Sequence, residues 1–137
     1  MEYDWIKFYP DGGVVHVEVF VDKLIDYHIK YPNEFSERVI DVVARVTRMC
    51  EERDVTQVCV ANLEGVNFYK INLISLSKLI WKLYKCSKDC AFVQSCEISN
   101  SGPIFNSIFN ALSPFLPVKM VSLISSPDEQ ETQEYYE

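Results

Sequence analysis

The stretch Val55-Thr56-Gln57-Val58-Cys59-Val60-Ala61-Asn62-Leu63-Glu64-Gly65 decides the fold of this chain. Its short apolar run, Val58 to Ala61, has no period-2 alternation, which is typical of a strand buried on both faces of a sheet. The strand ends at Asn62, and the chain turns at Gly65, where a positive φ costs little. A helical pattern follows from about Tyr69 to Tyr84. This order of strand, turn and helix predicts a parallel α/β sheet.

The central strand also predicts which side chains face the helices. We expect Val58 and Val60 to face one helical layer and Cys59 to face the other. A charge at Val60 would then be buried without a partner, so Val60→Asp is expected to abolish folding. Glu18→Gln, on a half-polar face, is expected to change stability by about 0.5 kcal/mol or less.

An antiparallel hairpin is predicted before the central strand. Trp5 to Tyr9 and Val14 to Val21 read as strands, and Pro10-Asp11-Gly12-Gly13 reads as the turn between them. The second strand alternates, with valines on one face and His16 and Glu18 on the other. His16 and Glu18 are either an acid/base pair or part of a solvated sheet face.

Helical and strand patterns then alternate along the chain. A helix is predicted from Asp22 to Tyr31, and a second one is capped by Asn33 or Ser36. Strands are predicted at Ala91–Ile98 and Val118–Ile124. The second helix has its apolar stripe at helical spacing: Val39, Val42, Val43, Val46, Met49 and Cys50. The fold class is therefore α/β, an antiparallel hairpin followed by βαβαβ parallel strands, with about five strands and helices packed on the sheet.

Length and charge indicate one domain with an acidic tail. The 137 residues carry a net charge of −7, and residues 128–137 hold five acids and no base. We expect a single domain over residues 1–127 and a disordered tail over 128–137. The remaining 15 acids and 13 bases make a nucleic-acid partner unexpected. With neither a signal peptide nor an apolar run of transmembrane length, the expected location is cytoplasmic.

No motif in the sequence specifies catalysis. Nucleophile elbows, phosphate loops and dinucleotide-binding glycine motifs are all absent from it. The five cysteines lack a usual zinc spacing and are expected to be reduced thiols. We therefore expect a protein that is not an enzyme and that uses neither a cofactor nor a metal.

Three segments resemble the CRAL-TRIO domain, the lipid-binding fold of phosphatidylinositol and tocopherol transfer proteins. Val60-Ala61-Asn62-Leu63-Glu64-Gly65 resembles the family's D-L-E-G strand end, with Asn62 in place of Asp. Ile98-Ser99-Asn100-Ser101-Gly102-Pro103-Ile104-Phe105 is similar to its I-N-A-P-x-x-F. Ser113-Pro114-Phe115-Leu116 with Lys119-Met120 resembles its K-P-F-L … K-I. The resemblance implies a compact, divergent CRAL-TRIO domain, either lipid-binding or a short BCH-type protein scaffold.

A second resemblance leads to a different class of function. Asn62-Leu63-Glu64-Gly65-Val66-Asn67-Phe68 looks like the D-L-S-G-V-x-F of STAS domains, which are assembly modules. Lys70-Ile71-Asn72 stands where that family has a phosphorylatable serine. This alternative implies a protein-interaction module without the phosphorylation switch.

Two candidate sites follow from these patterns. In the ligand-binding version, a lipid or other hydrophobic ligand lies in a cleft, with Lys119 meeting an anionic headgroup at its rim. The apolar residues expected to line this cleft are Phe105, Phe109, Leu112 and Phe115. Ser101 and Gly102 precede a predicted helix and either bind an anion or only cap that helix. In the scaffold version a protein partner is expected, and the sequence leaves homo-oligomerisation open.

Overall fold

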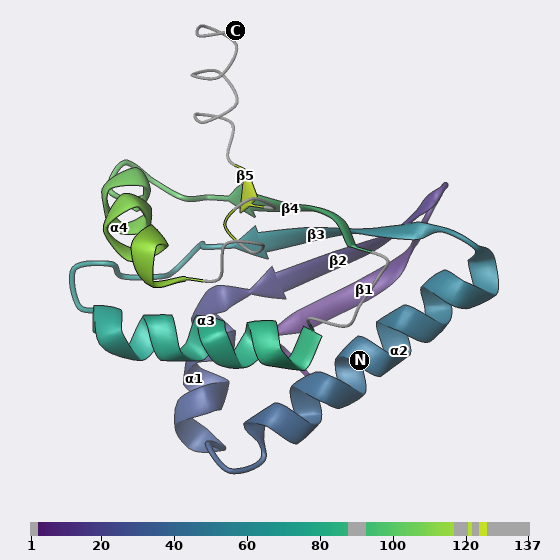
Figure 1. Ribbon diagram of the computed structural model, residues 1–137, viewed down its shortest axis with the longest axis horizontal. Helices are drawn as coiled ribbons and strands as arrows, with labels where there is room; N and C mark the ends of the chain where they lie inside the picture. The colour runs from purple at the N-terminus through teal and green to yellow at the C-terminus, as the bar shows by residue number, and fades with distance from the viewer. Residues whose placement is uncertain (1–2, 88–92, 117–120, 122–123, 126–137) are drawn as a thin grey trace, which may run out of the picture.

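The computed structural model describes residues 3–87, 93–116, 121 and 124–125. Its elements follow in the order β1 (Ile6–Asp11), β2 (Val14–Phe20), α1 (Val21–Lys30), α2 (Phe35–Arg53), β3 (Thr56–Asn62), α3 (Leu73–Ser87), β4 (Val93–Ser99), α4 (Phe105–Leu112), the 3₁₀ turn η1 (Ser113–Phe115) and β5 (Ile124–Ser125). After the first hairpin two helices, α1 and α2, lead to β3, and from β3 onward strands and helices alternate (Figure 1).

The sheet has the predicted α/β topology. β1 pairs with β2 in antiparallel fashion, and β2, β3, β4 and β5 are parallel neighbours in chain order. Four strands are full-length, and the described part of β5 has two residues. The predicted fold class is therefore confirmed, whereas most of the predicted strand Val118–Ile124 lies outside the described residues.

The described helices all pack on one face of the sheet (Figure 1). Each crossover advances the sheet in the same direction, and such crossovers are right-handed, so every helix reaches the same side. The prediction that β3 is buried on both faces is therefore wrong. Cys59 faces the helices, whereas Val58 and Val60 face away from them and are half-buried. We call the side of Val58 and Val60 the open face.

The core lies between this sheet and the helices. Val15 and Val17 of β2 are buried, as the alternation of the hairpin predicts. Trp5 and Leu24 join them in the same cluster. The predicted stripe of the second helix is confirmed, with Met49 and Val43 partly buried and these side chains buried: Phe35, Val39, Val42, Val46 and Cys50.

The starts of two helices differ from the predictions. α3 begins at Leu73 rather than near Tyr69, because the side-chain oxygen of Asn72 accepts hydrogen bonds from the backbone N–H groups of Ile74 (2.9 Å) and Ser75 (3.2 Å). At α2 the N-cap is Glu34, and no side chain caps the helix, so the expected cap at Asn33 or Ser36 is wrong.

Gly65 has the predicted positive φ, at +86°. A Cβ at this position would lie 2.8 Å from the Oδ2 atom of Asp22, in the first turn of α1. The turn after β3 therefore lies close to the start of α1, and it is the positive φ that favours glycine there, because the carboxylate of the exposed Asp22 can rotate away from an added methyl group.

An apolar cavity as the candidate functional site

A cavity of about 520 Å³ lies between the sheet and the helices. Its floor consists of helix-facing side chains of β1, β2, β3 and β4, and its walls come from α1, α2, α3 and α4. The floor residues are Ile6, Val17, Val19, Gln57, Cys59, Ala61, Cys96 and Ile98; the wall residues include Leu24, Val42, Val46, Leu76, Leu79, Leu83, Tyr84, Phe105, Phe109, Leu112 and Leu116.

The sequence explains why space remains here. The floor of the cavity is built from small side chains at the centre of the sheet, notably Ala61 and Cys59. The facing positions of α3 carry Leu76, Leu79 and Leu83, which cover the floor without filling the gap. Protein interiors are otherwise packed as densely as organic crystals, with few voids larger than a water molecule. Unfilled space of this size therefore distinguishes this region from an ordinary close-packed core.

Two thiols form part of the cavity floor. Cys59 and Cys96 are register partners on the adjacent parallel strands β3 and β4, and both face the cavity. A hydrogen bond between the two thiols, together with burial, raises the pKa of Cys59, and the same hydrogen bond lowers the pKa of Cys96. These directions fit Cys59 donating its S–H to the sulfur of Cys96.

Gln57, Tyr84 and the indole N–H of Trp5 supply the other polar side-chain groups of the lining, and among the described residues the Trp5 N–H is buried with no hydrogen-bond partner. Gln57 lies at the start of β3 and is buried. Tyr84 lies near the end of α3 and is half-buried. With two thiols, one amide, one phenol and one indole N–H among otherwise apolar side chains, the cavity suits an apolar molecule with a small polar group.

Three of the predicted ligand residues line the cavity together. Phe105, Phe109 and Leu112 lie on one side of α4, and the rings of Phe105 and Phe109 stack with centroids 5.6 Å apart. Phe105 and Leu112 are buried.

Phe115 does not line the cavity, which corrects the prediction at that position. Its side chain is 68% exposed, and the next residue, Leu116, is buried and lines the cavity instead. The tight 3₁₀ turn η1 after Leu112 rotates Phe115 outward and brings Leu116 inward. Lys119, the predicted headgroup contact, lies outside the described residues.

The predicted anion site lies in a loop rather than in a helix cap. Gly102 has a φ of +72°, and α4 begins only at Phe105 with Ile104 as its N-cap, where no side chain caps the helix. The expectation that Ser101 and Gly102 cap this helix is therefore wrong. Anion binding by Ser101 and Gly102 stays a prediction.

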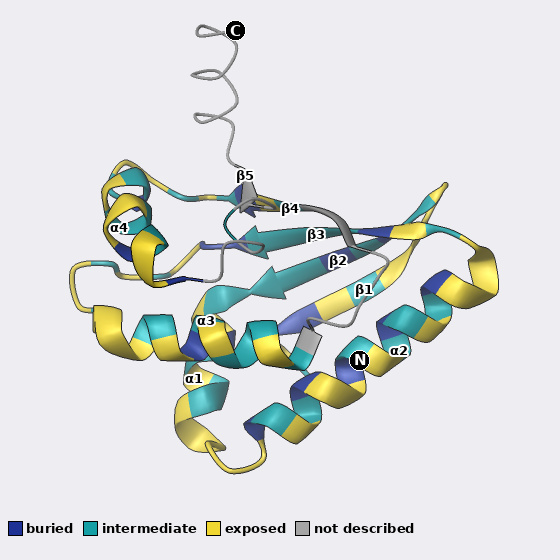
Figure 2. Ribbon diagram, viewed as in Figure 1, coloured by how far each residue is buried: buried dark blue, intermediate teal, exposed yellow. Residues whose placement is uncertain are grey.

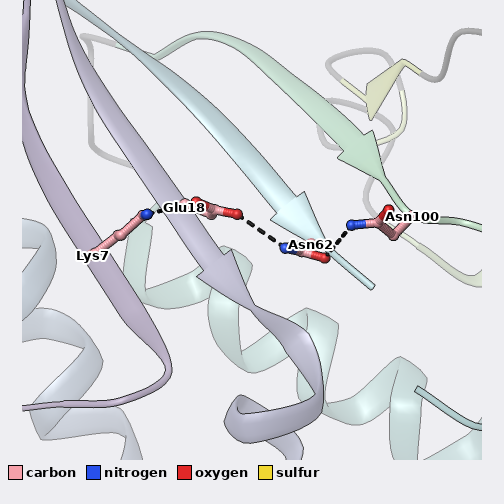
Figure 3. Close-up of polar contacts among 4 residues, drawn as sticks. All are labelled: Lys7, Glu18, Asn62 and Asn100. Carbon is pink, nitrogen blue, oxygen red and sulfur yellow. Dashed lines mark hydrogen bonds and ion pairs between the residues drawn. The ribbon is translucent and has the colours of Figure 1, made fainter. Parts of the chain in front are cut away.

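A polar chain on the open face was not predicted from the sequence. Glu18 of β2 pairs with Lys7 of β1 (3.4 Å) and accepts a hydrogen bond from the amide of Asn62 (3.0 Å), as Figure 3 shows. Asn62 in turn accepts a hydrogen bond from Asn100 (2.9 Å). The partners of Glu18 are therefore Lys7 and Asn62, while His16 packs on the ring of Tyr9.

The part of the chain that the structure describes has neither a cluster of three or more potential metal ligands nor a helix long and apolar enough to cross a bilayer. Its four cysteines are free thiols. Comparison of the sequence with models of known families and with curated proteins gives no match. The CRAL-TRIO and STAS resemblances therefore stay predictions.

Proposed function

We propose that this protein is a non-enzymatic binding domain of CRAL-TRIO type, which holds a lipid-like hydrophobic molecule between its sheet and its helices. The observation that carries the proposal is the apolar cavity of about 520 Å³. This volume falls within the range of roughly 300–1,000 Å³ found for small-molecule sites.

The lining supports the chemical class of the ligand. Each methylene that leaves water for this cavity contributes about 0.8 kcal/mol, so a chain of about ten methylenes contributes roughly 8 kcal/mol before the cost of immobilisation. The phenol of Tyr84 and the buried indole N–H of Trp5, which has no hydrogen-bond partner in the described structure, would provide hydrogen bonds for one small head group. A highly charged or sugar-like ligand would lose its hydration without replacement.

The test combines native mass spectrometry with a binding titration. Protein purified from cells is expected to carry a hydrophobic molecule, and delipidated protein is expected to bind a fluorescent fatty acid. Ala61→Trp fills the cavity and should abolish binding, whereas Val60→Trp, on the open face of the same strand, should leave it unchanged. Absence of a bound molecule, together with equal titrations for both variants, would end the proposal.

The second candidate function is a protein-interaction module of scaffold or STAS type, and the open face favours it. Among the described residues no helix covers Val58 or Val60, which lie on the same face of the central strand β3. A partner that packs on these side chains would complete a second layer. Val58→Glu should then abolish the association of the full chain with its partner while fatty-acid binding is retained.

A further inference from the structure

The outward side of α3 carries a stripe that the cavity does not explain. Ile74, Lys78, Trp81 and Lys85 follow one another at intervals of four, three and four residues, so they lie on one side of the helix. All four are exposed, with Ile74 68% and Trp81 39% accessible. The opposite side of α3 faces the cavity. Figure 2 shows exposed segments along this helix.

Phe115 extends this stripe onto the neighbouring turn. The indole N–H of Trp81 donates a hydrogen bond to the backbone oxygen of Phe115 at 2.7 Å, which holds η1 beside α3. The ring of Phe115 is exposed, although it is a large apolar side chain. We call the set of Ile74, Lys78, Trp81, Lys85 and Phe115 the α3 stripe.

The charge around the α3 stripe is opposite to that of the whole protein. Residues 65–88 contain five lysines and no Asp or Glu, in a chain with a net charge of −7. Neither Lys78 nor Lys85 forms an ion pair with any residue in the described ranges. Two unpaired ammonium groups between exposed aromatic and aliphatic side chains fit a partner that is anionic at its surface and apolar just below it.

We propose that the α3 stripe docks this protein on an anionic lipid bilayer, with α3 lying parallel to the surface. Lysines would contact the lipid phosphates, Trp81 would lie at the level of the head groups, and Ile74 and Phe115 would enter the acyl boundary. In this orientation α3 separates the bilayer from the cavity, since its inner side lines the cavity and Tyr84, which also lines it, packs edge-on against Trp81 with ring centroids 5.9 Å apart. Docking itself requires no ligand in the cavity.

Vesicle sedimentation with the full chain tests this proposal. The protein should sediment with vesicles of phosphatidylcholine mixed with phosphatidylserine, and not with phosphatidylcholine alone, and high salt should release it. Each lysine near an anionic membrane strengthens binding about fivefold, so Lys78→Gln with Lys85→Gln should weaken binding about 30-fold. Phe115→Ser should also weaken it, by removal of an exposed ring that contributes nothing to the core.

A charge-matched control separates the α3 stripe from net charge. Lys30→Gln with Arg53→Gln removes the same charge from exposed positions on α1 and α2 and should leave sedimentation nearly unchanged. Equal loss in both double variants, or equal binding to neutral and anionic vesicles, would overturn the proposal. Failure to bind any vesicle, with retention on immobilised polyglutamate, would also overturn it and point to an acidic protein partner.

The proposed ligand site is tested separately by the same proteins. The double lysine variant should bind the fluorescent fatty acid in solution as the natural chain does. Ala61→Trp should sediment with anionic vesicles although it binds no fatty acid. Failure of docking and failure of ligand binding therefore give different results.

Discussion

Asn62 and Asn100 join the ends of two parallel strands: the Nδ2 group of Asn100 donates to the Oδ1 atom of Asn62 at 2.9 Å. The same oxygen accepts from the backbone N–H of Glu64 at 3.0 Å, while the Nδ2 group of Asn62 donates to Glu18. Asn62 is buried, so each of these bonds replaces one to water. An asparagine therefore connects β2, β3 and the loop after β4 with both halves of its amide.

Asn62→Asp is expected to destabilise the protein by about 1–3 kcal/mol at neutral pH. The new carboxylate cannot donate to Glu18 and instead repels it, although it can still accept from Glu64 and Asn100. Thermal unfolding measures the loss. The matched control is Asn67→Asp, because Asn67 is exposed and uses only its oxygen, as acceptor for the N–H of Tyr69; unfolding temperatures that fall equally in both variants would contradict the role given to the Asn62 amide.

Gly65→Ala is expected to cost about 1–3 kcal/mol. The backbone at this position has a φ of +86°, and the added methyl group would lie 2.8 Å from Asp22. Gly12→Ala is the control, since its φ of +62° is also positive but its Cβ would meet nothing within 4 Å. Chemical denaturation of both variants separates backbone strain from the contact with Asp22, and an equal loss in both would show that the contact contributes nothing.

The sequence predicted the order of the elements well and their burial less well. The alternation of β2 separated Val15 and Val17 from Glu18 correctly, because one face is apolar and the other polar. The run around Val60 carries no such contrast, so periodicity could not show that half of it faces away from the helices. The strand order determines which face of β3 the helices cover, because every crossover places its helix on the same face of the sheet.

Val17→Asp and Val60→Asp test this single-layer arrangement. Val17 is buried in the core, so its replacement by aspartate should cost several kcal/mol and leave little folded protein. Val60 lies on the open face, so the expectation from the sequence alone that Val60→Asp abolishes folding is replaced: this variant should stay folded, with a smaller loss caused by its register neighbours Glu18 and Glu97. Val60→Lys should lose less, since those two carboxylates would then attract the new charge. If circular dichroism melts show that Val60→Asp is unfolded, a second layer must cover this face of the sheet, and the single-layer arrangement is wrong.

The candidate site was predicted in part, and for identifiable reasons. Helical spacing grouped Phe105, Phe109 and Leu112 correctly, because spacing alone defines the side of a helix. Because the chain changes to a 3₁₀ turn after Leu112, Leu116 rather than Phe115 lines the cavity. Pro114 is the only signal of this turn in the sequence. The pair Cys59 and Cys96 required the register between two strands, which no single sequence reveals.

His28 is expected to make stability fall on acidification. Burial, and then the nearby Lys82 ammonium, lower the pKa of His28 below its ordinary value of 6.5. The unfolded chain therefore binds a proton at a higher pH than the folded one, so the free energy of unfolding is unaffected well above pH 6.5 and falls as the pH drops through and below that value. His28→Gln should flatten this part of the pH profile, and Lys82→Gln should make the fall in the free energy of unfolding smaller. If His16→Gln, on the open face, flattens the pH profile of stability as much as His28→Gln does, the effect cannot be assigned to His28.

Ala61→Leu is expected to stabilise the ligand-free protein while reducing its capacity for ligand. Ala61 lines the cavity at the centre of the sheet, beside Leu63, Ile98 and Phe105. Extra methyl groups at this position would fill empty space and gain packing contacts, so stability should rise by about 1–2 kcal/mol. In a close-packed core the same change would cost about 1–3 kcal/mol by overpacking. Unfolding of delipidated protein in urea distinguishes the two signs: a lower midpoint for Ala61→Leu would mean that the cavity is closed in solution, and the proposed ligand site would then be lost with it.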